Sequence, residues 1–183
     1  MENGNEDRQP ATDSPRIYVA CLASYNSGIL HGAWIAADQG PDDIHAEIQS
    51  MLAKSREPVA EEWAIHDYEG FHGRRLAEYE SIETVAHIAN LIAEHGQLGA
   101  ELLAHCDDSP EAAREAISDS YQGAFDSPAH WAEQLLEDCG DLVQIPERLR
   151  GYFDFESYAR DAELSGDIFV IEVDRQHHVF WAR

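Results

Sequence analysis

The chain has 183 residues, 44% of them apolar, which is enough to build a core as one large domain or as two or three small ones. It holds 36 Asp and Glu against 12 Lys and Arg, for a formal net charge of −24. A charge of this size excludes DNA, RNA and anionic lipid as direct partners and favours association with a basic surface.

The first fifteen residues, MENGNEDRQPATDSP, predict a flexible polar tail. They lack the apolar core of a signal peptide, and no run of eighteen apolar residues follows that could cross a bilayer. We therefore expect a cytoplasmic protein with no membrane partner.

Residues 16–75 predict an N-terminal ββαβ module. Runs 16–24 and 31–37 have strand composition and flank a turn with Asn and Gly, which predicts a β-hairpin. Pro41 then opens a helix whose apolar residues fall on one face: Ile44, Ile48, Met51 and Leu52. Residues 61–69 can return as a third strand.

Residues 76–141 predict an acidic helical module. This stretch holds fifteen Asp and Glu and one basic residue, Arg114, whereas the two ends of the chain are closer to charge balance. Helical periodicity covers 81–94 and a shorter run around 98–103. Two further helix starts are predicted where a capping hydroxyl precedes a first-turn proline, at Ser109-Pro110 and Ser127-Pro128.

Residues 142–183 predict a C-terminal module, with a helical pattern that continues to about Ser165 and a β-hairpin made of IFVIEV and HVFWA. The predicted fold class is α+β. We expect an elongated row of three small modules, with a helix-rich acidic centre and short antiparallel sheets or hairpins at both ends. The module boundaries rest on shifts in composition alone.

The carboxylates of the acidic module recur at four-residue spacing on the predicted helices. One helix carries Glu111, Glu115 and Asp119, and the next carries Glu133, Glu137 and Asp141. Each step advances about 6 Å along a helix, which is similar to the separation of successive phosphates on one DNA strand. The single lysine of the chain, Lys54, lies outside the module. The repulsion between neighbouring carboxylates in these rows is therefore not offset by a lysine.

These rows predict a folded mimic of DNA that enters the basic groove of a DNA-binding protein. Two other interpretations stay open: ordinary solvated helix faces, and salt adaptation, which would spread acid over every module. The candidate partner-binding residues are the carboxylates of the acidic module: Glu78, Glu80, Glu83, Glu94, Glu101, Asp107, Asp108, Glu111, Glu115, Asp119, Asp126, Glu133, Glu137, Asp138 and Asp141.

No pattern in the sequence predicts catalysis, a cofactor or a metal site. The three cysteines, Cys21, Cys106 and Cys139, match no zinc spacing, and we expect them to be reduced and mostly buried. The neighbours His66-Asp67 and His177-His178 lie on predicted strands, where adjacent side chains point to opposite faces. Glu83 and His87 share a helix face but are too few to retain zinc.

Three separated segments resemble the ArdA family of antirestriction proteins: 18–35 (YVACLASYNSGILHGAWI), 61–71 (EEWAIHDYEGF) and 152–161 (YFDFESYARD). The resemblance implies a non-enzymatic bacterial protein, carried on a plasmid or transposon, that mimics bent B-DNA. It implies that the protein occupies the DNA-binding groove of type I restriction-modification enzymes, at the methyltransferase core. It also implies three modules in a row and a homodimer.

Residues 135–150 (LLEDCGDLVQIPERLR) resemble the antirestriction motif of the family. We expect this motif to have a structural role, either in packing or in dimer contacts. The residues concerned are Leu135, Leu136, Leu142, Ile145, Pro146, Leu149, Tyr152 and Phe153. The matched segments leave out most of residues 76–130, so no individual carboxylate is carried over from the family. The alternative function is an acidic binding or chaperone-like module for basic nucleic-acid-binding proteins.

Overall fold

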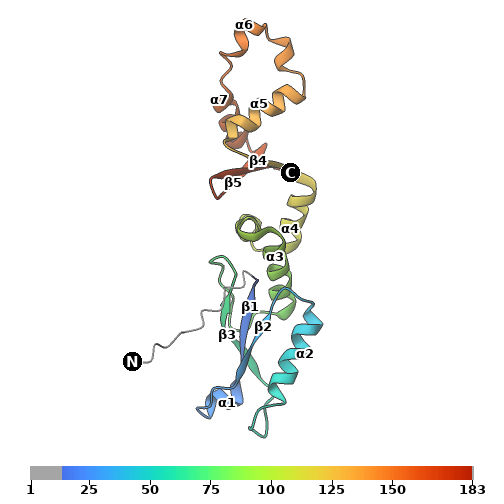
Figure 1. Cartoon of the computed structure of the whole chain (residues 1–183), viewed down its shortest axis with the longest axis vertical. Helices are drawn as coiled ribbons and strands as arrows, with labels where there is room; N and C mark the ends of the chain where they lie inside the picture. Colours follow the sequence, from blue (N-terminus) through green and yellow to red (C-terminus); the bar gives the residue numbers. More distant parts are fainter. Residues whose placement is uncertain (1–13, 183) are drawn as a thin grey trace, which may run out of the picture. The chain divides into compact units, whose positions relative to one another are not determined.

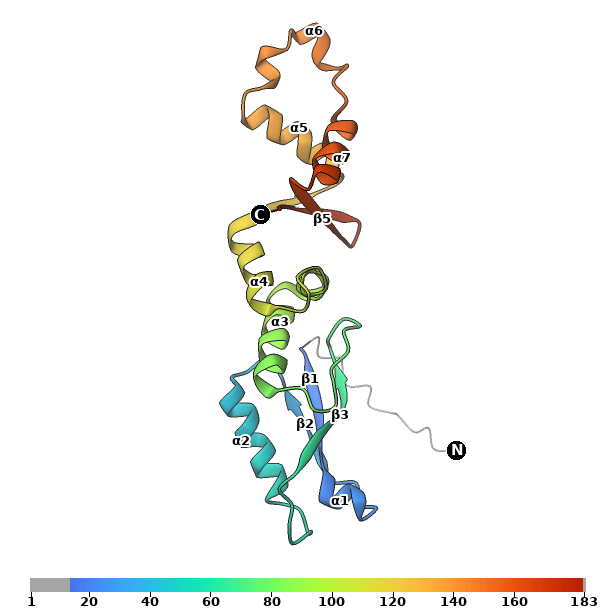
Figure 2. The same ribbon diagram turned by 180° about the vertical axis from the view of Figure 1, so that it is seen from behind.

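The computed structural model describes residues 14–182 and groups the chain into two compact units, Met1–Gly96 and Gln97–Arg183. Each unit contains one three-stranded antiparallel sheet together with α-helices (Figures 1 and 2). The predicted α+β class is confirmed, and the further division into three modules stays a prediction. Among the described residues, every helix is too short or too polar to span a bilayer.

The first sheet consists of β1 (Arg16–Cys21), β2 (Gly32–Ala36) and β3 (Trp63–Glu69), in the order β2-β1-β3. The predicted hairpin of β1 and β2 and the returning third strand are both confirmed. The strand predicted over 16–24 is too long, because β1 ends at Cys21 and a short helix, α1 (Leu22–Asn26), follows. Tertiary contacts select this helix: Ser24 is buried, and its Oγ shares a 2.9 Å hydrogen bond with Ser55 Oγ.

The core of the first unit lies between this sheet and the apolar face of the helix that follows β2. In α2 (Pro41–Leu52) the four residues predicted to face inward are buried, namely Ile44, Ile48, Met51 and Leu52. In β1 the alternating side chains of Ile17, Val19 and Cys21 have 0% exposure. Amphipathic spacing in the helix and alternation in the strand thus bury one face of each element.

The third helix, α3 (Ile82–His105), is interrupted at Gly96, where φ is 56° and ψ is −137°. A residue with a side chain rarely adopts this backbone conformation, so glycine permits the break. The apolar residues that recur at helical spacing before the break are buried: Ile82, Val85, Ile88 and Ile92. The boundary between the two units falls at the same glycine.

The second unit begins with residues 97–105 of α3, α4 (Pro110–Glu115) and a π-helical turn, η1 (Ala116–Ser120). It continues with β4 (Tyr121–Phe125), α5 (Pro128–Asp138), the 3₁₀ turn η2 (Leu142–Gln144), α6 (Glu147–Arg150) and α7 (Phe155–Ser165). The strands β5 (Ile168–Val173) and β6 (Gln176–Trp181) close the unit, and the sheet order is β4-β6-β5. The predicted closing hairpin is confirmed.

The two faces of the second sheet serve different purposes. One face packs on α5 and α7 through a cluster formed by Trp131, Ala132, Ala159, Ile168 and Val179. On the other face Phe169 and Phe180, which are register partners, stack with ring centroids 4.8 Å apart and planes 2° apart. His105 stacks on Phe169 at 4.0 Å, and the tilted ring of Tyr121 packs on Phe180 at 5.0 Å, so four aromatic rings are in contact in a row.

The sequence did not predict β4, because its five residues include a glycine and lie between two helix signals. Its pairing with β6 is irregular between Tyr121 and Gly123, as expected for a bulged edge strand. The predicted helix up to Ser165 is likewise interrupted: α6 ends at Arg150, and Asp154 starts α7 by accepting a 2.9 Å hydrogen bond from Ser157 N. That hydrogen bond lowers the pKa of the Asp154 carboxyl.

The burial of the cysteines and the structure at the end of the predicted tail differ in part from the predictions. Cys21 is buried, but Cys106 is half-buried and Cys139 is exposed at the end of α5. Residues 1–13 of the predicted tail lie outside the described residues. Pro15, at the end of that predicted tail, is buried, and its carbonyl accepts a 2.8 Å hydrogen bond from Ala37 N, so this residue packs with the first unit.

We expect Gly32→Ala to lower the free energy of unfolding by about 1–3 kcal/mol. A Cβ at Gly32 would lie 2.5 Å from Val19 O and 2.7 Å from the Tyr18 ring. Gly151→Ala is the matched control, because no atom lies within 4 Å of its added Cβ and its φ is −69°. Urea unfolding followed by circular dichroism measures both variants, and equal stabilities would contradict the close approach.

We also expect the stability of the protein to fall as the pH drops below the ordinary pKa of histidine, 6.5, in part through His178. Burial lowers the pKa of this residue in the folded state, so the unfolded chain takes up the proton first. The stabilisation is complete above pH 6.5 and is lost as the pH falls toward the lower folded pKa. His178→Gln should flatten the slope of thermal stability over this range, and an unchanged slope would refute the assignment.

Candidate partner-binding surface

The fifteen carboxylates of residues 76–141 are almost all accessible to solvent. Fourteen of them are exposed, and Glu80 is half-buried. The apolar residues of the same segments supply the buried faces, as Ile82 and Val85 do in α3 and Trp131 and Ala132 do in α5. Packing therefore orients these helices with the acid outward.

Four of the fifteen carboxylates belong to the first unit: Glu78, Glu80, Glu83 and Glu94. Glu83 Oε1 lies 3.8 Å from His45 Nε2, and Glu78 Oε1 lies 4.0 Å from His66 Nε2. Both of these contacts are made to histidine rings.

The row Glu111, Glu115 and Asp119 is exposed as predicted, but it is not one regular helix row. Ser109 caps α4 by accepting a 3.2 Å hydrogen bond from Ala112 N, and Pro110 occupies the first turn. The α-helix ends at Glu115 and the wider π-helical turn follows, so Asp119 departs from the four-residue step. Of the two alanines of α4, Ala113 is buried and Ala112 is exposed.

The second row is shorter than predicted. Glu133 and Glu137 are exposed on α5, opposite Trp131 and Leu136. The helix ends at Asp138 and the chain turns at Gly140, so Asp141 is exposed but lies beyond the helix. The Ser127 cap, which accepts from His130 N at 3.2 Å, confirms the predicted start of α5.

The remaining acids lie near helix ends and turns. Glu101 is exposed on the last part of α3, and Asp126 lies directly before the Ser127 cap. Asp107 and Asp108 have positive φ values, 50° and 66°, in the turn between α3 and α4. Aspartate is one of the few residues that tolerate this conformation, so these two acids also have a local structural role.

The residues of the resembled antirestriction motif divide between interior and surface. Leu136 and Leu142 are buried, and Leu135 packs against the core cluster around Trp131. Leu149 and Tyr152 are exposed, and with them Val143 at 72%. The chain between α5 and α7 loops away from the second sheet, with α6 at its far end (Figure 1). Part of the motif thus belongs to the packed interior, and part is exposed and available for contact with another protein.

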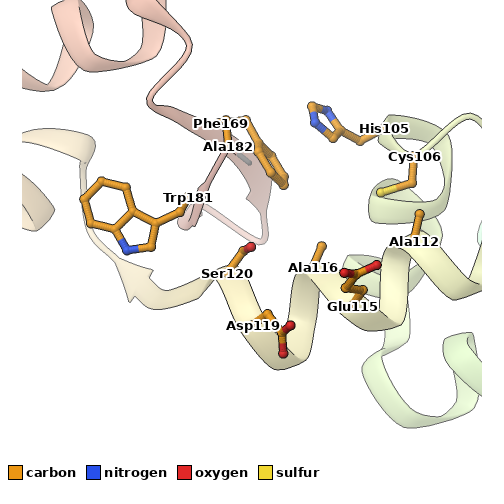
Figure 3. Close-up of a pocket in the computed structure, with 10 residues that line it drawn as sticks. All are labelled: His105, Cys106, Ala112, Glu115, Ala116, Asp119, Ser120, Phe169, Trp181 and Ala182. Atoms are coloured by element: carbon orange, nitrogen blue, oxygen red, sulfur yellow. The ribbon is translucent and has the colours of Figure 1, made fainter.

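A cavity of about 340 Å³, which the sequence did not predict, lies in the second unit beside the aromatic stack (Figure 3). It is lined by His105, Cys106, Ala112, Glu115, Ala116, Asp119, Ser120, Phe169, Trp181 and Ala182. These residues come from three separated parts of the chain, so only the tertiary structure brings them together. Burial, together with the charge of Asp107, raises the pKa of the Cys106 thiol, which disfavours a thiolate nucleophile.

The residues considered for metal binding or catalysis do not converge. His177 and His178 occupy opposite faces of β6, the first with a buried Nδ1 and the second sharing a 2.8 Å hydrogen bond with Tyr121. A bulge in β3 separates His66 from the regular pairing of Asp67 with Tyr18. Across residues 14–182, no group of three or more His, Cys, Asp or Glu could hold a metal ion.

Comparison with known proteins identifies the family. Residues 17–175 match the model of the antirestriction protein family ArdA, a range that takes in the first sheet from Ile17, the acidic segment 76–141 and the second unit as far as β5. A search of curated proteins finds no match. The family match extends through residues 76–130, which the resembling segments left out. Because the match covers most of the chain, the protein belongs to the ArdA family of antirestriction proteins.

Proposed function

We propose that this protein inhibits type I restriction-modification enzymes by presenting its carboxylates to their DNA-binding groove in place of DNA. Membership of the ArdA family supports an antirestriction role. The observation that carries the mimicry is the exposure of fourteen of the fifteen carboxylates of residues 76–141, a stretch with one basic residue. The inhibitor acts by occupancy, with no chemical step of its own.

The net charge of the protein is large enough to take the place of a segment of duplex DNA. Duplex DNA carries about one negative charge per 1.7 Å of its axis, so a net charge of −24 corresponds to roughly 40 Å of duplex. A basic groove that binds the protein releases counter-ions as it does when it binds DNA. Affinity then comes from the summed field and needs no reading of base edges.

The uneven distribution of the charge favours mimicry over general salt adaptation. Residues 142–183 hold eight acids and five bases, whereas residues 76–141 hold fifteen acids and one base. A salt-adapted surface would be acidic throughout. The concentration of acid in one segment supports a surface directed at a cationic partner. A location in the bacterial cytoplasm is part of this proposal.

The exposed part of the motif supports a homodimer. Val143 and Tyr152 are 72% and 85% exposed, and Leu149 lies between them in sequence on α6. Burying such side chains is favourable by about 1.5–3 kcal/mol each. We propose that a second copy covers them, which would double the charge that one inhibitor presents.

The salt dependence of binding tests the mimicry. We expect the affinity for a purified type I methyltransferase to fall by at least about tenfold between roughly 50 and 200 mM salt, because the counter-ions released on binding must be recaptured. Calorimetry measures the affinity, and displacement of labelled DNA shows that the site is shared. A flat salt response would remove the mechanism.

A cellular control separates this function from an acidic chaperone for basic proteins. Restriction of an unmethylated plasmid should be relieved by expression of the protein, while a methylation-protected plasmid should be unaffected. A chaperone-like module would give no effect specific to restriction.

Charge reversal tests the location of the surface. Changing Glu133, Glu137 and Asp138 to lysine should weaken binding by at least about tenfold, and each single change should have a small effect, because the attraction is a sum over many charges. The matched control changes Glu47, Glu61 and Glu62, which are exposed in the first unit outside residues 76–141. Both triple variants alter the net charge equally, so equal losses would contradict a surface within 76–141.

A further inference from the structure

Three exposed apolar side chains lie close together in sequence at the end of α1 and in the turn that follows it. Tyr25, Ile29 and Leu30 fall within six residues, and Leu30 is 87% exposed. Residues 22–30 (LASYNSGIL) contain no charged side chain, although the whole chain has a net charge of −24. Single exposed apolar residues are ordinary on a protein surface, whereas a group of them marks a site of contact. We refer to residues 25–30 as the α1 turn.

The backbone of the α1 turn is ordered by hydrogen bonds at the end of the first sheet (Figures 1 and 2). Gly28, with φ of 76°, donates its N–H to Tyr25 O at 2.9 Å, and Ile29 N–H donates to Ser24 O at 2.9 Å. This pair of bonds is the Schellman arrangement that ends many helices. Ser24 itself is buried, which anchors the turn to the first unit. The backbone that carries Ile29 and Leu30 is therefore in place before binding, which reduces the entropy that binding costs.

The α1 turn lies at the margin of the candidate partner-binding surface. The ring of Tyr25 meets the ring of His66 edge-on, with centroids 4.8 Å apart, and His66 Nε2 lies 4.0 Å from Glu78 Oε1. Glu78 is one of the exposed carboxylates of residues 76–141. A partner that binds these carboxylates therefore comes within reach of the turn.

Positive charge lies on another side of the α1 turn. Ser24 Oγ shares a 2.9 Å hydrogen bond with Ser55 Oγ, and the neighbours of Ser55 in sequence are the exposed Lys54 and Arg56. A basic groove would repel these two cations. The turn therefore suits an apolar protein surface beside such a groove, and not the groove itself.

We propose that the α1 turn docks on an apolar patch of the target enzyme at the rim of its DNA-binding groove. The inference rests on the proposed function for the identity of the partner. The carboxylates take the place of DNA in the groove, while Tyr25, Ile29 and Leu30 make a contact that the charged backbone of DNA does not offer. Burial of apolar surface releases no counter-ions, so this contact adds affinity that salt does not remove.

The salt dependence of binding tests the docking contact. The double variant Ile29→Ser with Leu30→Ser should bind the purified type I methyltransferase at least about fivefold more weakly at every salt concentration, because apolar burial is lost. The slope of log affinity against log salt should stay the same, since no charge is altered. Calorimetry between about 50 and 200 mM salt measures both quantities. An unchanged affinity, or a changed slope, would show that the turn makes no such contact.

Leu164→Ser is the matched control for the loss of exposed apolar surface. Leu164 is 78% exposed on α7 in the second unit, outside residues 76–141. This variant should bind the methyltransferase as the unchanged protein does. A loss equal to that of the double variant would show a general effect of surface hydrophobicity and overturn the assignment to the α1 turn.

Photo-crosslinking identifies what covers the α1 turn. Replacing Leu30 with p-benzoylphenylalanine in the full-length protein should give a covalent adduct with the methyltransferase on irradiation, whereas the same replacement of Leu164 should give none. An adduct between two copies of this chain in place of the methyltransferase adduct would assign the turn to self-association and overturn the proposal.

The same calorimetry distinguishes this inference from the proposed function. If the unchanged protein binds with a steep salt response and the double variant binds equally well, the docking contact is wrong and the mimicry stands. If binding shows a flat salt response and the double variant binds more weakly, the mimicry is wrong and the docking contact stands. Absence of binding by the unchanged protein would refute both.

Discussion

Packing on two small antiparallel sheets must offset the electrostatic repulsion among the charged side chains, which give a net charge of −24. Self-repulsion destabilises a compact state, and the cost rises if the charges approach one another. The protein meets this constraint by keeping the carboxylates of residues 76–141 in solvent, where water and salt screen them. Stability must then come from apolar packing, which is concentrated on the faces of the two sheets.

Local sequence signals fix the residues at which the short helices begin. Ser109 and Ser127 each cap a helix that begins with proline, and both hydroxyls satisfy an N–H of the first turn. Once α5 starts at a fixed residue, its periodicity turns Trp131 and Leu136 inward and Glu133 and Glu137 outward. The cap therefore determines where the charge appears, although it carries no charge itself.

Elements with strong periodicity or caps could be predicted from the sequence, and elements selected by tertiary contacts could not. The faces of α2 and α3, both helix starts with Ser-Pro, and the closing hairpin all follow from residue spacing. The structure has the helix Leu22–Asn26 where a strand end was predicted, because the buried Ser24 hydrogen-bonds to the half-buried Ser55. The strand β4 was missed because five residues with an internal glycine carry little local signal, and its partner β6 lies more than fifty residues away.

The candidate partner-binding surface also combines features that could be predicted from the sequence with features that depend on tertiary contacts. Which residues are acidic, and that they face solvent, could be predicted from spacing, since a helix with one apolar face must present the other face to water. The lengths of the rows could not, because the π-helical turn at 116–120 and the end of α5 at Asp138 depend on packing. The cavity beside Phe169 could not be predicted at all, as its walls come from residues far apart in the chain.

The field of the carboxylates acts over a longer range than direct contact does, and this difference bears on specificity. Attraction between exposed charges extends to about the Debye length, roughly 8 Å at physiological salt, and is tolerant of the positions of single carboxylates. It can bring the inhibitor to many basic proteins. Hydrogen bonds and close packing act only at contact, so they depend on where the fold places each side chain, as the Ser127 cap does for Glu133 and Glu137. The summed charge would give rapid association with any basic groove, whereas the fixed positions of the helices that carry the charge would favour one geometry of docking over the others.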